Sequence, residues 1–268
     1  MDYYSIYIIV ITLICLAIVI ILYNIKELTI TNELTIKKEL KENFDISKDE
    51  KNEIYSYLKI ILNCFTKSNI PFWIIGGTTL GSVRHGEMIP WDDDADIGVF
   101  EKDMEKVLSI NKVINNFGYE IVPHWRIFKF RKIGQEYPFV DIFCYFEDNG
   151  TYYMNHIELR NMWKNEYYKY DELFPLKLYK FGNLNLPGPN YPVDYLDRMY
   201  PKWQYMAYIT YDHKNMENKN EEIKLDSNNE EHKLKSYKII KVNNNDKKKK
   251  LKKYNKLYNE NILLFEEK

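Results

Sequence analysis

The feature that most constrains this chain is a run of four carboxylates within five residues, Asp92, Asp93, Asp94 and Asp96. At neutral pH these side chains repel one another, and a divalent cation is the usual way to make such a cluster tolerable. Side chains on a strand alternate between its two faces, so a strand at 94–100 would place Asp94 and Asp96 on the same face. The run therefore predicts a Mg²⁺ or Mn²⁺ site held by Asp94 and Asp96, with Asp92 as a further ligand from the preceding turn.

A third carboxylate, Asp141, interrupts the apolar segment FVDIF at 139–143. Burying a carboxylate without a partner is costly, so this residue needs compensation. One interpretation is that Asp141 faces the predicted metal site from a neighbouring strand, which would give the three converging carboxylates of metal-assisted phosphoryl transfer. The other interpretation is an ion pair with a basic side chain such as Lys129 or Arg131.

Other acidic motifs fit the run less well. An EF-hand loop needs Gly after Asp96 and Glu at its twelfth position, where this chain has Ile97 and Asp103. The DDxxD box of prenyl-diphosphate enzymes is formally present at 92–96, but that box lies on a helix of an all-α fold, whereas this segment alternates like a strand. A solvated acidic turn without function is the bland alternative, and its uncompensated repulsion would be a net cost.

The N-terminal region is apolar. Residues 3–25 contain no charged side chain, and about 20 apolar residues suffice to cross a bilayer. We expect a single-pass transmembrane anchor at 1–25 and a polar stalk at 26–46. A cleaved signal peptide is less well supported, because the basic n-region is missing. Lysines follow the apolar segment and none precedes it, which favours a cytosolic body.

The body at 47–212 has the mixed helix and strand patterns of an α/β (α+β) fold. A capping-box pattern at Ser47 opens an amphipathic helix with an apolar stripe. Further elements are expected as a helix at 102–116 that ends before a C-cap glycine at Gly118, and as strands at 70–75, 94–100, 119–122, 126–133 and 138–146. Lys, Asn and Glu dominate from 213 to 268, which predicts a largely disordered tail with a short C-terminal helix. The net charge of -1 gives no reason to expect a nucleic-acid partner.

The run GGTTLGSVRHGEMIPWDDDADIGV at 76–99 resembles the signature of the LicD and fukutin family. Similarity to that family extends over about residues 70–205, with Pro201 where the family commonly has Gly. The resemblance implies the fold of the nucleotidyltransferase superfamily, a mixed sheet flanked by helices. The superfamily pattern is a Gly-Gly pair after a strand, two acids one residue apart, and a third acid on a later strand. It is matched in that order by Gly76-Gly77, Asp94 with Asp96, and Asp141.

Members of this family transfer phosphocholine or ribitol phosphate from a CDP-linked alcohol to a glycan hydroxyl. The resemblance therefore implies a metal-dependent transferase that releases CMP, with a glycan or glycoprotein as acceptor. It implies the catalytic residues Asp94, Asp96 and Asp141, and a donor-binding set of Gly76, Gly77, Arg84, His85 and Lys129. A guanidinium can bind phosphate oxygens in bidentate fashion. A structural hydrogen bond in the turn is an equally good interpretation of His85.

Two other functions stay open. One is a nucleotidyltransferase that acts on a small molecule or on RNA, and the other is a non-enzymatic membrane scaffold that has kept the fold. The side of the membrane also stays open, because family members that modify glycoproteins work in the Golgi lumen, whereas the lysine distribution favours the cytosol.

Overall fold

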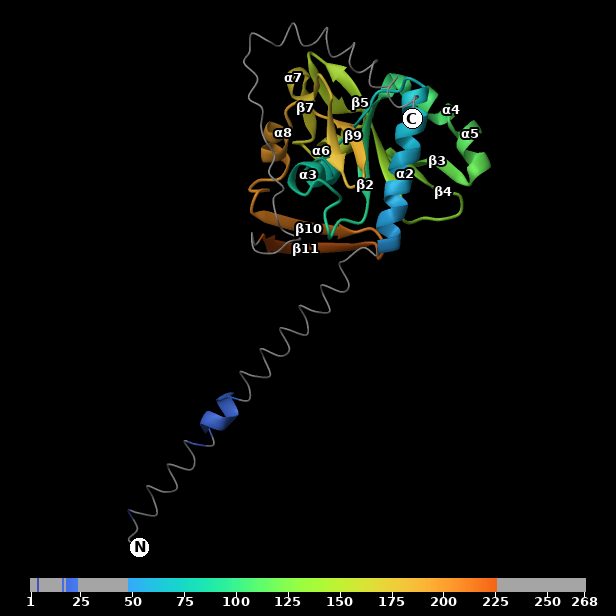
Figure 1. Cartoon of the computed structure of the whole chain (residues 1–268). Helices are drawn as coiled ribbons and strands as arrows, with labels where there is room; N and C mark the ends of the chain where they lie inside the picture. Colours follow the sequence, from blue (N-terminus) through green and yellow to red (C-terminus); the bar gives the residue numbers. More distant parts are fainter. Residues whose placement is uncertain (1–3, 5–15, 17, 24–47, 226–268) are drawn as a thin grey trace. The chain divides into compact units, whose positions relative to one another are not determined.

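The computed structural model describes Tyr4, Leu16, residues 18–23 and residues 48–225 (Figure 1). Contacts divide the chain into one unit that ends at Asp45 and another that begins at Ile46. In the first unit the described residues are helical. Within the described parts of the chain, no helix combines the length and apolar character needed to cross a bilayer. Most of the predicted anchor, the whole stalk, Ser47 and residues 226–268 lie outside these parts.

A seven-stranded mixed sheet forms the centre of the second unit, with strand order β1-β2-β5-β4-β3 and with β6 and β7 continuing from β5. Strands β2 and β5 run parallel, and the other pairs in this sheet are antiparallel. The strand bounds are β1 Phe72–Ile74, β2 Ala95–Phe100, β3 Tyr119–His124, β4 Ile127–Lys132, β5 Val140–Asp148, β6 Thr151–Met154 and β7 Tyr167–Lys169. The predicted mixed α/β fold is confirmed.

Helices pack against this sheet and against the hairpin of β8 and β9 (Figure 1). α2 contacts β5 and β9, and α3 contacts β2, β8 and α8. The helix bounds are α2 Lys48–Lys67, α3 Gly76–Arg84, α4 Met104–Ser109, α5 Asn111–Ile114, α6 Ile157–Met162, α7 Tyr170–Leu173 and α8 Pro192–Met199, with 3-10 turns at Glu101–Asp103 and Asn115–Phe117. The short hairpins are β8 Lys177–Phe181 with β9 Leu184–Gly188, and β10 Met206–Asp212 with β11 Glu217–Lys224.

The apolar patterns of the sequence account for these elements. The buried stripe of α2 includes Ile54, Leu58, Ile61 and Phe65, whereas the predicted Leu62 is only partly buried. On β2 the alternate residues at 95, 97 and 99 are fully buried, which leaves the opposite face of the strand for polar groups. The predicted helix at 102–116 is a series of short helical segments, and it ends at Gly118 with φ +81° as a C-cap glycine does.

Gly76-Gly77 follows β1 after a single residue, as the superfamily pattern implied, and begins α3. One expectation is corrected. The disordered tail predicted from residue 213 is wrong for residues 213–224, because β10 and β11 form an antiparallel hairpin across that boundary. The buried side chains of Ala207 and Ile209 alternate along β10, and this alternation was hidden by the polar composition around it.

Candidate active site

Three carboxylates converge where β2 and β5 lie side by side. Asp96 on β2 and Asp141 on β5 are register partners in this parallel pair, and Asp94 lies just before β2. One carboxylate oxygen from each of Asp94, Asp96 and Asp141 lies within 4.8 Å of the other two. Asp94 and Asp141 are almost completely buried, at 7% and 6% exposure. The structure thus brings together the three residues that the sequence indicated as catalytic.

Burial makes this cluster electrostatically unfavourable without a cation. Burial and the nearby Asp94 together raise the pKa of Asp141 to about 7, while Lys129 and His213 oppose the shift. Burial and the charge of Asp94 likewise hold the pKa of Asp96 well above its ordinary value. The pKa of Asp94 is also raised, mainly by burial. The nearby cations therefore compensate the negative charges of Asp94 and Asp141 only in part.

The cluster fits a hard divalent cation. Asp141 Oδ1 is buried and has no hydrogen-bond partner among the described residues. Lys129 Nζ lies 3.7 Å from it, which is too long for a hydrogen bond. Carboxylate oxygens are the ligands that Mg²⁺ and Mn²⁺ prefer, and two oxygens on opposite sides of a Mg²⁺ ion are about 4.2 Å apart, twice the usual bond length.

Asp92, predicted as a further metal ligand, lies next to the carboxylate cluster. Neither group of described residues whose ligand atoms converge includes it. Its carboxylate lies against the start of α3, where a Cβ added at Gly77 would be 2.8 Å from Asp92 Oδ2. The role of Asp92 as a metal ligand stays a prediction. Burial and the neighbouring Asp94 hold the pKa of Asp92 well above its ordinary range.

The Gly-Gly pair allows α3 to begin directly beside the carboxylates. Gly76 has φ +52°, and a Cβ there would be 2.9 Å from Asp96 Oδ2. Only glycine combines this backbone conformation with such a close approach at little cost. The Gly76 N–H donates to the hydroxyl of Tyr195 at 2.9 Å. The pair thus lies next to the cluster, as the superfamily pattern implied, and its role in binding a donor stays a prediction.

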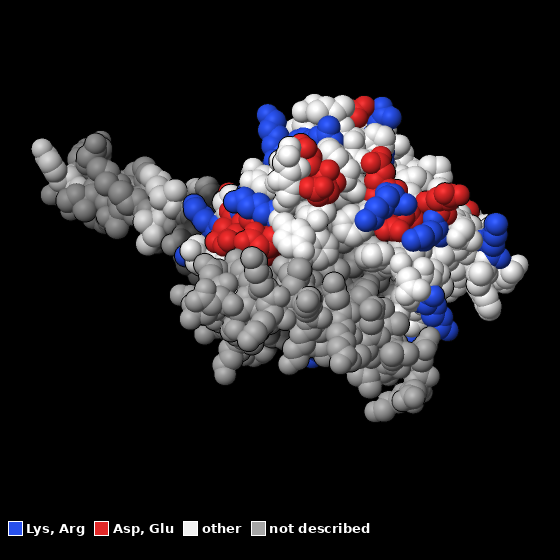
Figure 2. Space-filling view, turned by 90° about the horizontal axis from the view of Figure 1, so that it is seen from above, with Lys and Arg blue, Asp and Glu red and all other residues white. Residues whose placement is uncertain are grey.

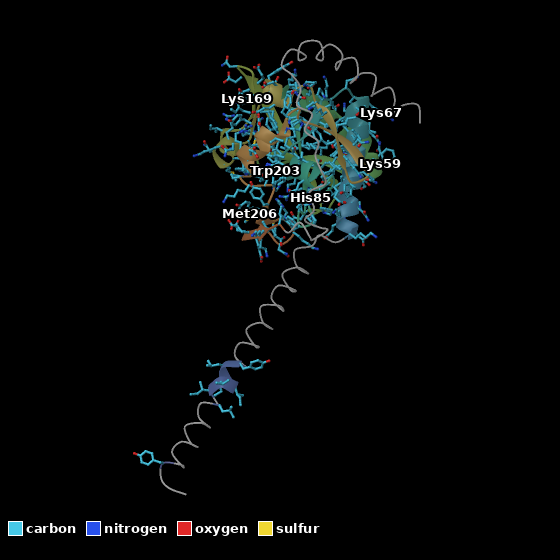
Figure 3. The ribbon with its side chains drawn as sticks, turned by 60° about the vertical axis from the view of Figure 1, so that its left-hand side comes forward. Lys59, Lys67, His85, Lys169, Trp203 and Met206 are labelled. Carbon is cyan, nitrogen blue, oxygen red and sulfur yellow. The ribbon has the colours of Figure 1, made fainter. Side chains whose placement is uncertain are left out.

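Arg84 and His85, predicted to bind the donor phosphates, are buried at 1% and 3% exposure. Arg84 Nη1 donates to the carbonyl oxygens of Trp203 and Met206 at 3.0 and 3.3 Å. Arg84 Nε donates to His85 Nε2 at 2.9 Å. Figure 3 shows His85 beside the segment that carries Trp203 and Met206. Burial lowers the pKa of Arg84 to about 10. These contacts attach residues 203–206 to α3, and they support a structural hydrogen bond as the interpretation of His85.

The ammonium group of Lys129 lies close to both Asp141 and an aromatic ring. Its ammonium lies 3.7 Å from Asp141 Oδ1 and 3.1 Å from the centroid of the Phe139 ring. The two interpretations of Asp141 therefore coincide, since it joins the carboxylate cluster and also faces a basic side chain. Arg131, two residues along the same strand, instead pairs with Glu120 and Glu136.

His213 and Asp93 belong to the site and were not identified from the sequence. The backbone N–H of His213 donates to Asp93 Oδ2 at 2.8 Å, and the ring atom Nδ1 of His213 lies 2.8 Å from Asp93 Oδ1. The other ring nitrogen, Nε2, lies 3.5 Å from Asp94 Oδ2. Burial disfavours the charged ring, but Asp94 and Asp93 outweigh it and raise the pKa of His213 to about 9. The sequence signal that could have indicated His213 is the turn that begins at Asp212. In the structure, Asp212 Oδ1 accepts a hydrogen bond from the Asn215 N–H in this turn.

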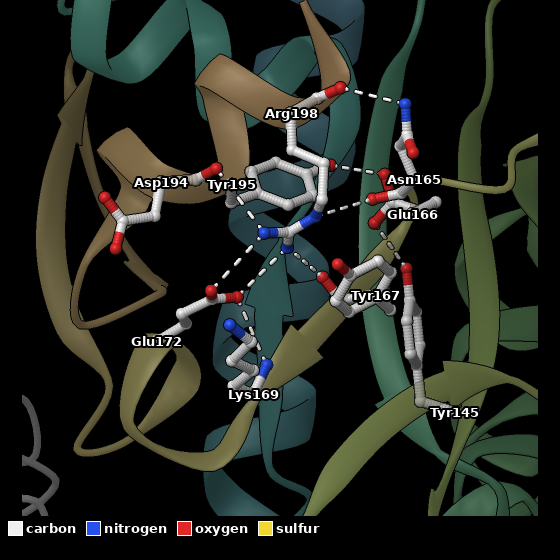
Figure 4. Close-up of polar contacts among 9 residues, drawn as sticks. All are labelled: Tyr145, Asn165, Glu166, Tyr167, Lys169, Glu172, Asp194, Tyr195 and Arg198. Atoms are coloured by element: carbon white, nitrogen blue, oxygen red, sulfur yellow. Dashed lines mark hydrogen bonds and ion pairs between the residues drawn. The ribbon is translucent and has the colours of Figure 1, made fainter.

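Glu166 is a further buried acid, and its polar contacts are drawn in Figure 4. Glu166 is 4% exposed and accepts hydrogen bonds from the hydroxyls of Tyr145 and Tyr195. Because Tyr195 also accepts from the Gly76 N–H, a continuous chain of hydrogen bonds joins Glu166 to the first residue of α3. Burial raises the pKa of Glu166 to about 7, and both tyrosines oppose that shift. Next to these hydrogen bonds, Arg198 of α8 forms an ion pair with Glu172 of α7 at 3.0 Å (Figure 4).

Comparisons with known proteins identify sequences similar to this chain. An uncharacterized protein of Rickettsia prowazekii (strain Madrid E) is 34% identical over 176 residues, which cover 66% of this chain and 64% of that protein. The chain thus spans less than two thirds of that relative's length. Ribitol 5-phosphate transferase FKRP of Homo sapiens is 35% identical over 46 residues, or 17% of this chain and 9% of that protein.

Among solved structures, the lincomycin-bound lincosamide antibiotic adenylyltransferase LnuA has a TM-score of 0.35 and 21% identity, over 54% of this chain and 81% of that chain. Likeness at that level carries no conclusion about activity. The family model for the LicD/FKTN/FKRP nucleotidyltransferase domain matches residues 69–191. That segment contains Gly76-Gly77, Asp94, Asp96 and Asp141. Residues 69–191 of this chain therefore match the LicD/FKTN/FKRP nucleotidyltransferase domain.

Proposed function

We propose that this domain transfers a phospho-alcohol group from a CDP-linked alcohol to a glycan hydroxyl, with a divalent metal held by Asp94, Asp96 and Asp141. The observation that carries the proposal is the convergence of these carboxylates, with a buried Asp141 oxygen that has no hydrogen-bond partner among the described residues. The family match and the short similarity to a ribitol 5-phosphate transferase support the phospho-alcohol class.

The residues of the chain divide the work of such a transfer. Asp94, Asp96 and Asp141 hold the metal, and a bound Mg²⁺ or Mn²⁺ would neutralise charge on the phosphoryl oxygens. With a divalent cation bound, Asp141 would be ionised, and an ionised carboxylate also suits a group that accepts the proton of the acceptor hydroxyl. Lys129 keeps a positive charge next to Asp141. Gly76-Gly77 leave the start of α3 open for close approach to the donor.

The charges visible on one face of the molecule give no support for a nucleic-acid partner. On the face shown in Figure 2, lysines and arginines are interspersed with aspartates and glutamates and do not form a continuous basic surface. Nucleic-acid binding usually requires such a surface. The apolar segment near the N-terminus completes the proposal as a membrane anchor, which would hold the domain near a membrane-bound or secreted glycan.

The test is release of CMP from CDP-choline, CDP-ribitol and CDP-glycerol in the presence of Mn²⁺, with and without a glycan acceptor. We expect metal-dependent CMP release from at least one donor, and its loss in Asp94→Asn. Asp148→Asn is the matched control, because Asp148 is exposed at the far end of β5. Incorporation of a nucleotide into a small molecule or RNA would instead support the nucleotidyltransferase alternative. A well-folded protein without either activity would support the scaffold alternative.

A further inference from the structure

His213 reaches the carboxylate cluster from an element far along the chain. It follows β10, at the turn of the β10–β11 hairpin, and its partner Asp93 is 120 residues away in sequence. The imidazole lies between two carboxylates, with Nδ1 toward Asp93 and Nε2 toward Asp94. The rings of Phe139 and Tyr211 contact it edge-on, at centroid distances of 5.5 and 4.9 Å. Polar and aromatic contacts together therefore fix the orientation of the ring.

We propose that His213 Nε2 is a nitrogen ligand of the metal ion that Asp94, Asp96 and Asp141 hold, and that Asp93 orients the ring. This inference rests on the proposed metal-dependent function. Histidines that bind metals usually donate their other ring N–H to a carboxylate, which fixes the tautomer and aims the free lone pair at the metal. Asp93 is placed for that role at 2.8 Å from Nδ1.

The distance between His213 and Asp94 suits a shared ion, whereas His213 shares no ligand group with Asp96 or Asp141, so one common ion would draw these ligands together. Nε2 lies 3.5 Å from Asp94 Oδ2, and two ligands bound to one ion at about 2.0 to 2.2 Å are separated by roughly 3 to 3.5 Å. Asp94 belongs both to the group with Asp96 and Asp141 and to the group with Asp93 and His213. It therefore links the imidazole to the cluster that contains the unpartnered oxygen of Asp141.

A nitrogen ligand would change which metal the site prefers. Carboxylate and water ligands suit Mg²⁺ and Mn²⁺ alike, whereas imidazole shifts preference toward the later transition metals. The proposal therefore predicts a centre that favours Mn²⁺ over Mg²⁺. The competing explanation is that His213 serves as a fixed positive charge that compensates the carboxylates. The two explanations predict opposite effects on metal affinity, because removal of a ligand weakens binding and removal of a competing cation strengthens it.

The experiment is pulsed EPR of Mn²⁺ bound to the full chain, with Mn²⁺ affinity measured in parallel by calorimetry. We expect ¹⁴N modulation from a coordinated imidazole in the unaltered protein. In His213→Gln we expect loss of that modulation and at least ~10-fold weaker Mn²⁺ binding, with a smaller change for Mg²⁺. His156→Gln is the matched control, because His156 precedes α6, outside both ligand groups. The ¹⁴N modulation and the Mn²⁺ affinity should both be unchanged in His156→Gln.

Three outcomes are distinguishable. Bound Mn²⁺ without ¹⁴N modulation in the unaltered protein would overturn the assignment of His213 and leave the carboxylate site intact. Tighter Mn²⁺ binding by His213→Gln would do the same and would identify the ring as a compensating cation. Absence of Mn²⁺ binding by the unaltered protein would contradict the proposed function itself. The EPR result on the unaltered chain decides the question even if His213→Gln does not fold.

Discussion

Asp96 and Asp141 lie directly opposite each other on the parallel strands β2 and β5. Their side chains project from the same side of the sheet, so two negative charges share one buried environment with Asp94. Burial and the charge of Asp94 raise the pKa of both carboxyl groups. Without a cation, this pair is a source of instability at the centre of the domain, and the following predictions depend on that relationship.

Replacement of Asp141 by Asn should leave the metal-free protein equally or more stable, because the environment of Asp141 already disfavours its negative charge. The stabilisation conferred by Mn²⁺ should decrease, and turnover should fall by at least ~100-fold, the range typical of a general base. Thermal melts with and without Mn²⁺ and the rate of CMP release measure these effects. Asp148→Asn on the same strand is the control. A clear drop in metal-free stability with near-normal turnover would place Asp141 in a purely structural ion pair with Lys129.

The metal-free protein should lose stability as pH rises. The folded-state pKa of Asp141 is raised from 3.8 to about 7, so its contribution is present below 3.8 and is lost as pH rises through 7. The pKa of His213 is raised from 6.5 to about 9, so its contribution is present below 6.5 and is lost as pH rises through 9. Both effects have the same sign. Melting temperatures of chelator-treated protein from about pH 6 to about pH 9 should therefore fall, and a flat or rising series would contradict the assignment.

Tyr195→Phe should destabilise the domain and disturb the start of α3. The hydroxyl of Tyr195 accepts from the Gly76 N–H and donates to Glu166, so its removal leaves two buried polar groups without a partner. The expected loss is about 1 to 3 kcal/mol of unfolding free energy. Urea denaturation measures it. Tyr153→Phe on the half-exposed strand β6 removes a hydroxyl outside this network and should change stability little. Equal stabilities for the two variants would show that the chain from Glu166 to Gly76 contributes nothing.

The domain should require the β10–β11 hairpin. A chain of residues 46–225 keeps the hairpin, whereas a chain of residues 46–212 loses β11 and His213. In the shorter chain β10 becomes an unpaired edge strand, and the contact between His213 and Asp93 is absent. We expect the shorter chain to melt at a lower temperature and to bind Mn²⁺ more weakly. Identical melting and Mn²⁺ affinity would mean that the domain ends at Asp212 after all.

The sequence carried enough information to predict the central strands and the three carboxylates. Alternation along β2 and the isolated acid in β5 each depend on neighbouring residues only, and local patterns of this kind are readable from one chain. The sequence did not predict that a helix starts at Gly76-Gly77, because glycine is a poor helix former. Glycine occurs there because a larger residue would collide with the side chains of Asp92 and Asp96.

His213 and Tyr195 could not be assigned because their roles depend on contacts between distant segments. His213 meets Asp93 across 120 residues, and Tyr195 meets Gly76 across 119 residues. The hairpin that carries His213 is rich in Asn, Lys and Glu, a composition that usually accompanies disorder. Its stability comes from the ladder between β10 and β11 and from its attachment to Arg84, neither of which leaves a local apolar pattern.

The most direct test of the central claim is to determine which phosphorus atom is attacked during metal-dependent cleavage of a CDP-linked alcohol. In H₂¹⁸O with Mn²⁺, the domain should slowly hydrolyse its preferred donor, with water in place of the glycan hydroxyl. Attack at the phosphorus that bears the alcohol places ¹⁸O in the phospho-alcohol and leaves CMP unlabelled, and mass spectrometry of the two products measures this. The account predicts that result, with no cleavage by Asp94→Asn. Label in CMP would show attack at the nucleotide phosphorus and would contradict phospho-alcohol transfer in favour of nucleotidyl transfer.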